Sequence, residues 1–405
     1  MWYAGIDWAD EHHDAVVIDE RGQRVAALRV AHTADGLQRL VDFLQGSGDV
    51  RTQPAQVACI IETNQGLLIS SLLEAGLPVY PVNPKTVDRQ RGAAGAKTDA
   101  IDAYLLARKG RSDLADLRRL QPDSPLIAEL KVLTRDQDGL IQQQTRLVNQ
   151  LTACLKAYFP AALTLFGKLQ QPTTLAFLQT FPTLAAARAA TVEELDALLR
   201  AAGHPQPRAK AAAIAAQLQQ PQLTADPVLC RAKSRLMLTL VGQLQALLSA
   251  IAAYDAEIQR LFLTHADSAV FASLPRAATR LAPRLLAEWG DDRGRYADVA
   301  SVQALAGTAP VPWTSGKLVT VHRRQACNKR LRNALQQFAW QSTQREAWAA
   351  AYYQEKRDAG KSHAMALRAL ANQWVRIIYA LWSKHEAYDP AIFLAARKAH
   401  RAHAA

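Results

Sequence analysis

The sequence predicts an α/β domain at the N-terminus, a long helical middle with coiled-coil repeats, and a mostly α-helical C-terminal domain. Over residues 1–115, short apolar runs alternate with segments of helical periodicity. Over residues 123–265, apolar side chains recur at alternating spacings of four and three, which is the pattern of a coiled coil. From 266 to about 395, helical periodicity dominates around one β-rich run at 311–321.

In the first part, three strands in quick succession are followed by alternating helices and strands. Arg21-Gly22 is a turn signal between the second and third strands, which indicates an antiparallel meander. The expected elements are strands at 3–6, 15–18 and 25–30, a helix at 34–44, a strand at 57–61, a helix at 67–73, a strand at 79–82 and a helix at 98–108. This order, βββαβαβα, is that of the ribonuclease H fold.

The middle part contains two heptad-bearing helical arms, one from Leu126 to Tyr158 and one from Leu240 to Leu261. A helix of about 33 residues spans about 50 Å, so the arms are longer than the core helices of a compact domain. Both an intramolecular antiparallel hairpin and an oligomerisation stalk agree with this pattern. An Ala/Leu-rich insert at about 160–230 separates the arms, and Thr191 with Glu194 predicts a capping box within it.

The formal net charge of +12 favours a polyanionic partner. The excess is concentrated between Val270 and Trp340. This segment contains eleven Lys and Arg residues and four Asp and Glu residues, a local net charge of +7. Charge alone does not separate a nucleic-acid surface from a solvated one.

Other features argue against a membrane or secreted protein. No run of about 18 uninterrupted apolar residues exists, and the first residues resemble a strand more than a signal peptide. The four cysteines (Cys59, Cys154, Cys230 and Cys327) lie far apart without metal-ligand spacing, which fits a reducing cytoplasm. We therefore expect a cytoplasmic protein without a membrane span.

Four carboxylates stand where such a fold would bring them together. Asp7 follows the first strand and Glu62 follows the fourth, so parallel pairing of these strands would place the two side by side. Asp99 and Asp102 are three residues apart on one helix face, and Thr98 can cap that helix. Each residue alone has an ordinary structural explanation, such as a turn or a helix N-terminus. Their coincidence favours catalysis.

Carboxylates gathered in one pocket repel each other unless a cation neutralises them. Hard oxygen ligands suit Mg²⁺, with Mn²⁺ as a substitute. Two such ions, typically about 3.5–4 Å apart, can clamp the attacking and leaving oxygens of a phosphodiester.

The sequence resembles the insertion-sequence 110 family of transposases, whose N-terminal domain is RuvC-like with a DEDD motif. The matching N-terminal stretches are Gly5-Ile6-Asp7-Trp8-Ala9, Ile60-Ile61-Glu62-Thr63, Val82-Asn83-Pro84 and Lys97-Thr98-Asp99-Ala100-Ile101-Asp102-Ala103. The matching C-terminal stretches are residues 281–286, residues 306–311, Ser315-Gly316-Lys317 and Val321-His322-Arg323-Arg324. The middle of the chain resembles the family only in its general organisation, a coiled coil with an insert.

The resemblance implies a DNA recombinase in which the four carboxylates hold the metal and Ser315 is the nucleophile. By itself, Ser-Gly would indicate only a turn. The basic residues around it would contact nucleic acid, and they are Lys317, His322, Arg323, Arg324, Lys329 and Arg330. The family usually has a glycine-rich turn near 274–275, where this chain continues with Arg276-Ala277-Ala278. Arg276 and Arg280 are expected to replace that turn by side-chain contacts.

The resemblance also implies partners. These are donor and target DNA, a structured guide RNA encoded by the element itself, and further copies of the chain in a dimer or tetramer near the nucleoid. The composition permits an RNA partner but does not indicate one.

Three other functions compete with recombination. A hydrolytic RuvC-like Holliday-junction resolvase or nuclease would use the carboxylates and leave Ser315 as a turn residue. A sugar-kinase-like ATPase also opens with a Gly-Ile-Asp strand, but it would need glycine-rich nucleotide loops that the heptads after residue 123 do not supply. A non-catalytic RNA-binding protein would join no DNA.

Overall fold

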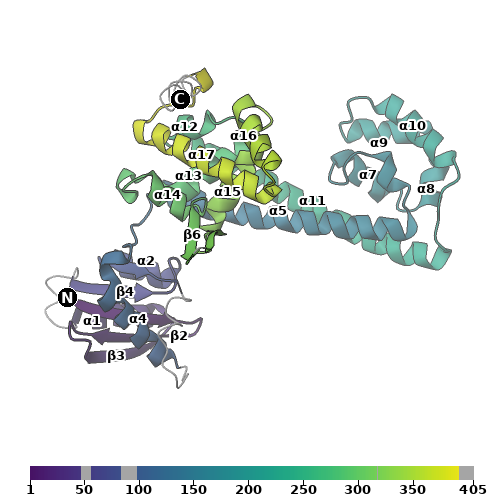
Figure 1. Cartoon of the computed structure of the whole chain (residues 1–405). Helices are drawn as coiled ribbons and strands as arrows, with labels where there is room; N and C mark the ends of the chain where they lie inside the picture. The colour runs from purple at the N-terminus through teal and green to yellow at the C-terminus, as the bar shows by residue number, and fades with distance from the viewer. Residues whose placement is uncertain (47–55, 84–97, 317, 392–405) are drawn as a thin grey trace. The chain divides into compact units, whose positions relative to one another are not determined.

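The computed structural model describes residues 1–46, 56–83, 98–316 and 318–391. The chain divides into two compact units, Met1–Pro122 and Asp123–Ala405 (Figure 1). The first unit is the predicted mixed α/β domain, and the second is largely helical. The further division of the second unit at residue 266 stays a prediction.

The first unit has the element order that the sequence predicts. Its elements are β1 (Trp2–Trp8), β2 (His12–Ile18), β3 (Arg24–Ala31), α1 (Ala34–Gly46), β4 (Val57–Ile61), α2 (Leu67–Glu74), β5 (Val79–Pro81) and α4 (Asp99–Asp113), followed by a short 3-10 turn. The five strands form one sheet in the order β3-β2-β1-β4-β5. β1 to β3 are antiparallel, whereas β4 pairs in parallel with both β1 and β5.

Helices cover both faces of this sheet. One face packs on α1 and α2 through a core that includes Ile6, Cys59 and Leu40. The other face packs on α4, against which Ile60 and Val16 are buried. Gly5 makes the second contact close, because a Cβ atom there would lie 1.9 Å from the Ala103 carbonyl oxygen and 2.4 Å from the Ala107 amide nitrogen. The glycine therefore sets how near α4 lies to β1.

The second unit contains two long helices, α5 (Pro125–Tyr158) and α11 (Pro227–Thr264), which correspond to the predicted arms. They lie antiparallel against each other: the start of α5 and the end of α11 share one core, and their opposite ends share another. The Gln137 amide donates to Asp255 across this hairpin at 2.8 Å. The intramolecular hairpin is therefore present, while coiled-coil supercoiling stays a prediction.

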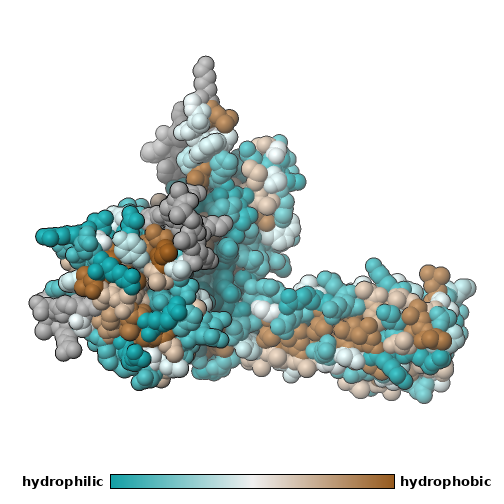
Figure 2. All heavy atoms as spheres, turned by 90° about the horizontal axis from the view of Figure 1, so that it is seen from below, coloured by the Kyte–Doolittle hydropathy of each residue, from teal (hydrophilic) through white to brown (hydrophobic). Residues whose placement is uncertain are grey.

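Five short helices form the insert at the far end of the hairpin: α6 (Ala162–Leu165), α7 (Pro172–Thr180), α8 (Leu184–Ala189), α9 (Val192–Ala201) and α10 (Pro207–Gln219). The predicted capping box of Thr191 and Glu194 opens α9. Apolar side chains remain exposed along the hairpin (Figure 2), and they include Val132, Leu236 and Leu238. An oligomerisation stalk formed by the arms stays a prediction.

The helices after α11 pack around the other end of the hairpin in a core rich in tryptophan, which includes Trp289, Trp374 and Trp382. They are α12 (Ser268–Ala272), α13 (Ala278–Trp289), α14 (Val299–Leu305), α15 (Lys329–Ser342), α16 (Ala347–Asp358) and α17 (His363–Lys384). Between α14 and α15 lie β6 (Pro310–Ser315) and β7 (Leu318–Arg323), none of whose described residues belongs to that core. The predicted β-rich run is the β6–β7 hairpin.

One described helix, α11, is long and apolar enough to cross a membrane by length and composition. A single helix of this kind is weak evidence of a membrane span, because core helices of soluble proteins meet the same criteria. Here α11 packs along α5 and contributes to both cores of its unit.

Candidate functional site

The register of the sheet places Asp7 and Glu62 at neighbouring strand ends. Ile6 and Ile61 are the last pair of the parallel β1–β4 ladder, and the two carboxylates follow them directly. Gly5 faces α4, so Asp7, two residues further along the same strand, projects to the same side. Ile60 also faces α4, and continuing the alternation places Glu62 on that side.

Asp99 and Asp102 lie in the first turn of α4, the helix that covers this face. The Thr98 side chain accepts a hydrogen bond from the Ile101 amide at 3.3 Å, which confirms the predicted N-cap. Three residues apart, the two carboxylates share one side of the helix, and the positive end of the helix dipole stabilises them. The fold thus directs all four predicted carboxylates to one side of the sheet, while their role as metal ligands stays a prediction.

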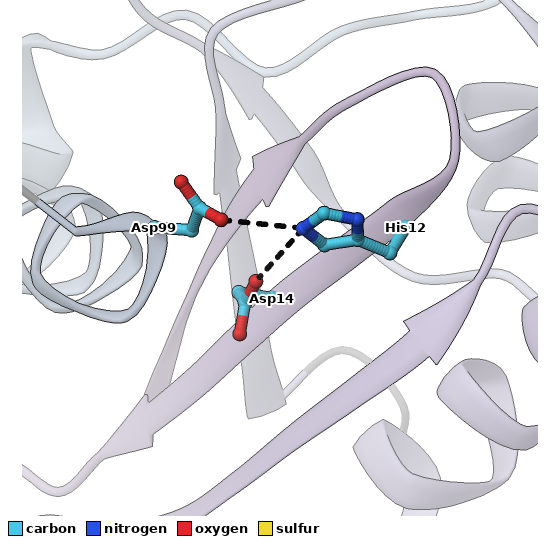
Figure 3. Close-up of side chains that lie close together, drawn as sticks. All are labelled: His12, Asp14 and Asp99. Carbon is cyan, nitrogen blue, oxygen red and sulfur yellow. Dashed lines mark hydrogen bonds and ion pairs between the residues drawn. The ribbon is translucent and has the colours of Figure 1, made fainter.

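Three residues that the sequence reasoning missed complete this region: His12, Asp14 and Arg29. Asp14 lies directly opposite Asp7 in the β1–β2 ladder, so both side chains project to the same face. Arg29 of β3 donates to both carboxylate oxygens of the buried Asp14, at 2.7 Å from Nη2 and 3.1 Å from Nε, and to Asp99 at 2.9 Å. The His12 Nε2 atom lies 3.2 Å from Asp99 Oδ2 and 4.0 Å from Asp14 Oδ2 (Figure 3).

These contacts hold Asp99 in its charged form. The hydrogen bond from His12 is the largest cause that lowers the pKa of Asp99, and the charge of Arg29 lowers it further against the opposing effect of burial. The hydrogen bond to Asp14 in turn raises the pKa of Arg29. One guanidinium therefore neutralises two carboxylates from different elements, β2 and α4.

The donor atoms fit a divalent cation. One ligand atom each from His12, Asp14 and Asp99 lies within 4.8 Å of the others, a spacing that one ion can bridge. Carboxylate oxygens are the ligands that Mg²⁺ and Mn²⁺ prefer, and a histidine nitrogen suits Mn²⁺ better than Mg²⁺. The cluster and the carboxylates around it support divalent-metal binding at this face, without selecting one metal.

Ser315, in the second unit, is the last residue of β6 and is exposed. It pairs with Leu318 across a two-residue turn whose first residue, Gly316, has φ +56°, in the left-handed region that glycine adopts without strain. Among the described residues, no hydrogen-bond partner of the Ser315 hydroxyl is found. The serine is therefore presented at the tip of a hairpin.

Trp313 and His322 lie on the same face of the hairpin as Ser315. Trp313 is 55% exposed and packs edge-on against His322 at 5.8 Å between ring centroids. The imidazole is also within 3.0 Å of the Thr320 hydroxyl. Because His322 pairs with Val311, four positions from Ser315 along β6, it is too remote within this hairpin to act as the base for the serine.

The other predicted nucleic-acid contacts differ in their surroundings. Lys317 lies outside the described residues. Arg280 makes a two-point ion pair with Asp255, whereas Arg276 is exposed with φ +57°, a left-handed conformation that glycine would favour. Arg323 ends β7 and Arg324 follows it, while Lys329 and Arg330 open α15 as exposed residues. Arg276 thus adopts a backbone conformation that glycine would adopt without strain.

A buried network anchors the chain just after the hairpin. Asn328 caps α15 and also donates to Glu288 at 2.8 Å, and Arg135 of α5 donates to the same carboxylate at 2.7 Å. Burial alone would raise the pKa of Glu288, but the hydrogen bond and charge of Arg135 outweigh it, so the pKa is lowered. The base of the hairpin is therefore held firmly although its tip is exposed.

Comparisons with known proteins agree with this arrangement. A model of the DEDD-type IS110 transposases matches residues 4–160, and a model described as the transposase IS116/IS110/IS902 family matches residues 268–354. The mini-circle protein of IS117 from Streptomyces coelicolor, a candidate transposase by its name, is 32% identical across 96% of this chain and 95% of its own. A 44.8 kDa protein of insertion element IS116 from Streptomyces clavuligerus is 30% identical across 96% of each chain. A 42 kDa protein of IS900 from Mycobacterium paratuberculosis is 28% identical across 97% of this chain and 98% of its own.

Both ends of the chain match models of one family, and a relative that is 32% identical aligns over nearly its full length. The chain therefore belongs to the IS110/IS116/IS902 family of transposases.

Proposed function

We propose that this transposase cuts and rejoins DNA by metal-assisted phosphoryl transfer with Ser315 as the nucleophile. The observation that supports the proposal is the register of β1 and β4 and the position of α4, from which Asp7, Glu62, Asp99 and Asp102 are inferred to lie on the same side of a ribonuclease H-like, RuvC-like sheet. Ser315 enters as an exposed hydroxyl at a hairpin tip, in the stretch that matches the family model.

The carboxylates would hold Mg²⁺ or Mn²⁺, and Asp14 joins them as a fifth acidic group opposite Asp7. Bound there, the ions supply positive charge to the phosphate and to the leaving oxygen. Arg29 and His12 contact Asp99 and favour its ionised form, and a bound cation would take the place of their positive charge at that carboxylate. Thr98 fixes the turn of α4 that presents Asp99 and Asp102.

In the proposed reaction, the Ser315 oxygen forms a bond to phosphorus as the bond from phosphorus to one DNA strand oxygen breaks. The serine proton leaves, and the departing strand end takes up a proton as a free hydroxyl. One phosphoester bond replaces another, so rejoining needs no external energy source. The hydroxyl of a new strand then displaces the serine and restores a phosphodiester.

The partners of the protein are proposed on the same grounds. Donor and target DNA, an element-encoded guide RNA and an assembly of two or four copies in the bacterial cytoplasm, near the nucleoid, are proposed from the family. The net charge of +12 supports a nucleic-acid partner of either kind. The other candidate is a hydrolytic RuvC-like resolvase or nuclease, which the carboxylate face alone would support.

Metal dependence tests the carboxylate half of the proposal. Strand transfer by the wild-type protein should stop in excess EDTA and return with Mg²⁺ or Mn²⁺, and Glu62→Gln or the pair Asp99→Asn with Asp102→Asn should stay inactive. Asp113→Asn is the matched control, because Asp113 lies at the opposite end of α4, where it pairs with Lys109 four residues earlier, and helix pairs of this spacing contribute little. Full strand transfer in EDTA would contradict the proposal.

A further inference from the structure

Arginines from three elements of the second unit influence one another electrostatically, and no acidic partner is found for them among the described residues. Arg323 ends β7, Arg332 lies in α15, and Arg368 lies in α17, which packs along α15. Burial is the main cause that lowers the pKa of Arg368, followed by the positive charges of Arg323 and Arg332, so both lie within electrostatic range of it. Arg332 and Arg368 are partly buried, whereas Arg323 is exposed.

Several other arginines of this unit have the carboxylate partner that these three lack among the described residues. Each of the following is paired with a carboxylate: Arg135 with Glu288, Arg280 with Asp255, Arg284 with Asp138, Arg293 with Asp267, and Arg295 with Asp123. Among the described residues, no ion pair is found for Arg323, Arg332 or Arg368. The parts of this unit outside the description, Lys317 and residues 392–405, contain no Asp or Glu.

The hydrogen-bond inventory shows the same deficit. The Nε atoms of Arg368 and of Arg324, the residue after Arg323, are buried and have no hydrogen-bond partner among the described residues. Within the described part of the chain, the hydrogen bond found for Arg332 is a weak one, 3.4 Å from its Nη1 to the Cys327 sulfur. Buried donors without acceptors and gathered like charges both destabilise a fold unless an anion compensates them.

We propose that Arg323, Arg332 and Arg368 form a binding site for a phosphodiester group of nucleic acid. A phosphate offers several charged acceptor oxygens, and guanidinium groups bind it by paired N–H donors. Arg323 ends the strand that returns from Ser315, so a nucleic acid bound along the hairpin would bring its backbone to this site. The proposal rests on the proposed function only for the source of the phosphate.

Arg368→Gln tests the site, with Arg376→Gln as the matched control, because Arg376 is exposed on the same helix. In chloride buffer, the melting temperature of Arg368→Gln should equal or exceed that of the wild type, since the repulsion is relieved. Inorganic phosphate at constant ionic strength should raise the melting temperature of the wild type and of Arg376→Gln more than that of Arg368→Gln.

Binding of labelled duplex DNA and of a structured RNA, measured in EDTA against salt concentration, identifies the source. For the nucleic acid whose phosphate occupies the site, Arg368→Gln and the exposed Arg323→Gln should each weaken binding about tenfold. Each should also reduce by about one the slope of log affinity against log salt concentration. The inference fails if both variants bind DNA and RNA within about twofold of Arg376→Gln, with unchanged slopes. Because binding in EDTA needs neither metal nor Ser315, loss of strand transfer in Ser315→Ala leaves this result intact and tests the proposed function separately.

Discussion

The carboxylate face of the first unit and the serine hairpin of the second are built in opposite ways. The carboxylates lie on a five-stranded sheet and a capped helix, and Asp14 and Asp99 already share Arg29 as a counter-charge. Ser315 ends a two-stranded hairpin on which Trp313 and Val321 are 55% and 64% exposed. A two-stranded hairpin is marginally stable by itself.

The first unit is therefore ordered before a ligand binds, whereas the hairpin offers an exposed surface to a ligand. The first unit holds its charges in place before any ligand arrives, which is what metal-assisted chemistry requires. The hairpin exposes apolar and aromatic surface that a bound nucleic acid could cover by base stacking. We therefore expect substitutions at the carboxylate face to act through packing and charge, and substitutions at the hairpin to act through binding.

Gly5→Ala should disrupt the packing of α4 on β1, on which the carboxylate face depends. Its new Cβ would lie 1.9 Å from the Ala103 carbonyl oxygen, so α4 must move and carry Asp99 and Asp102 with it. We expect strand transfer to fall below detection and the free energy of unfolding to fall by about 2–3 kcal/mol. Urea unfolding measures the second effect. Gly46→Ala, where a Cβ meets nothing within 4 Å, should keep both properties.

Trp313→Ala should leave the melting temperature nearly unchanged, because the side chain is largely exposed, and should weaken binding of single-stranded DNA. The loss of one stacked base corresponds to roughly 1–3 kcal/mol, or roughly 5- to 150-fold. Fluorescence anisotropy measures the affinity. Leu223→Ala, at an exposed apolar residue between α10 and α11, serves as the control. Equal affinities for the two variants would remove Trp313 from the binding surface.

Arg29→Gln sharpens the account of the carboxylate face. Without its positive charge, Asp14 and Asp99 should bind a divalent ion several-fold more tightly, because cation–cation repulsion is removed. Titration with Mn²⁺, followed by the paramagnetic signal of the free ion, measures the affinity. Arg24→Gln, an exposed residue of the same strand, should match the wild type. Weaker Mn²⁺ binding by Arg29→Gln would show that Arg29 organises the ligands more than it competes with the ion.

Local signals made much of the first unit predictable. The element order and the Thr98 cap followed from periodicity and capping residues, and the parallel pairing of β1 and β4 was expected from the fold that this order indicates. Asp14 and Arg29 were missed because their pairing depends on the β2–β3 register and on the placement of α4. Arg368 was missed because an arginine in an amphipathic helix resembles any solvated residue until its neighbours are known. Ser315 in sequence indicates a turn, and only the family resemblance singled it out.

The central claim is that Ser315 attacks DNA with the help of metal bound at the carboxylate face. Its most direct test is denaturing electrophoresis of reactions with end-labelled DNA, followed by mass spectrometry of the DNA-linked peptide. The account predicts a covalent adduct at Ser315 that forms with Mg²⁺ and is absent in EDTA, in Ser315→Ala and in Asp99→Asn with Asp102→Asn. An adduct that persists undiminished in Ser315→Ala, or cleavage by that variant without any adduct, would contradict it.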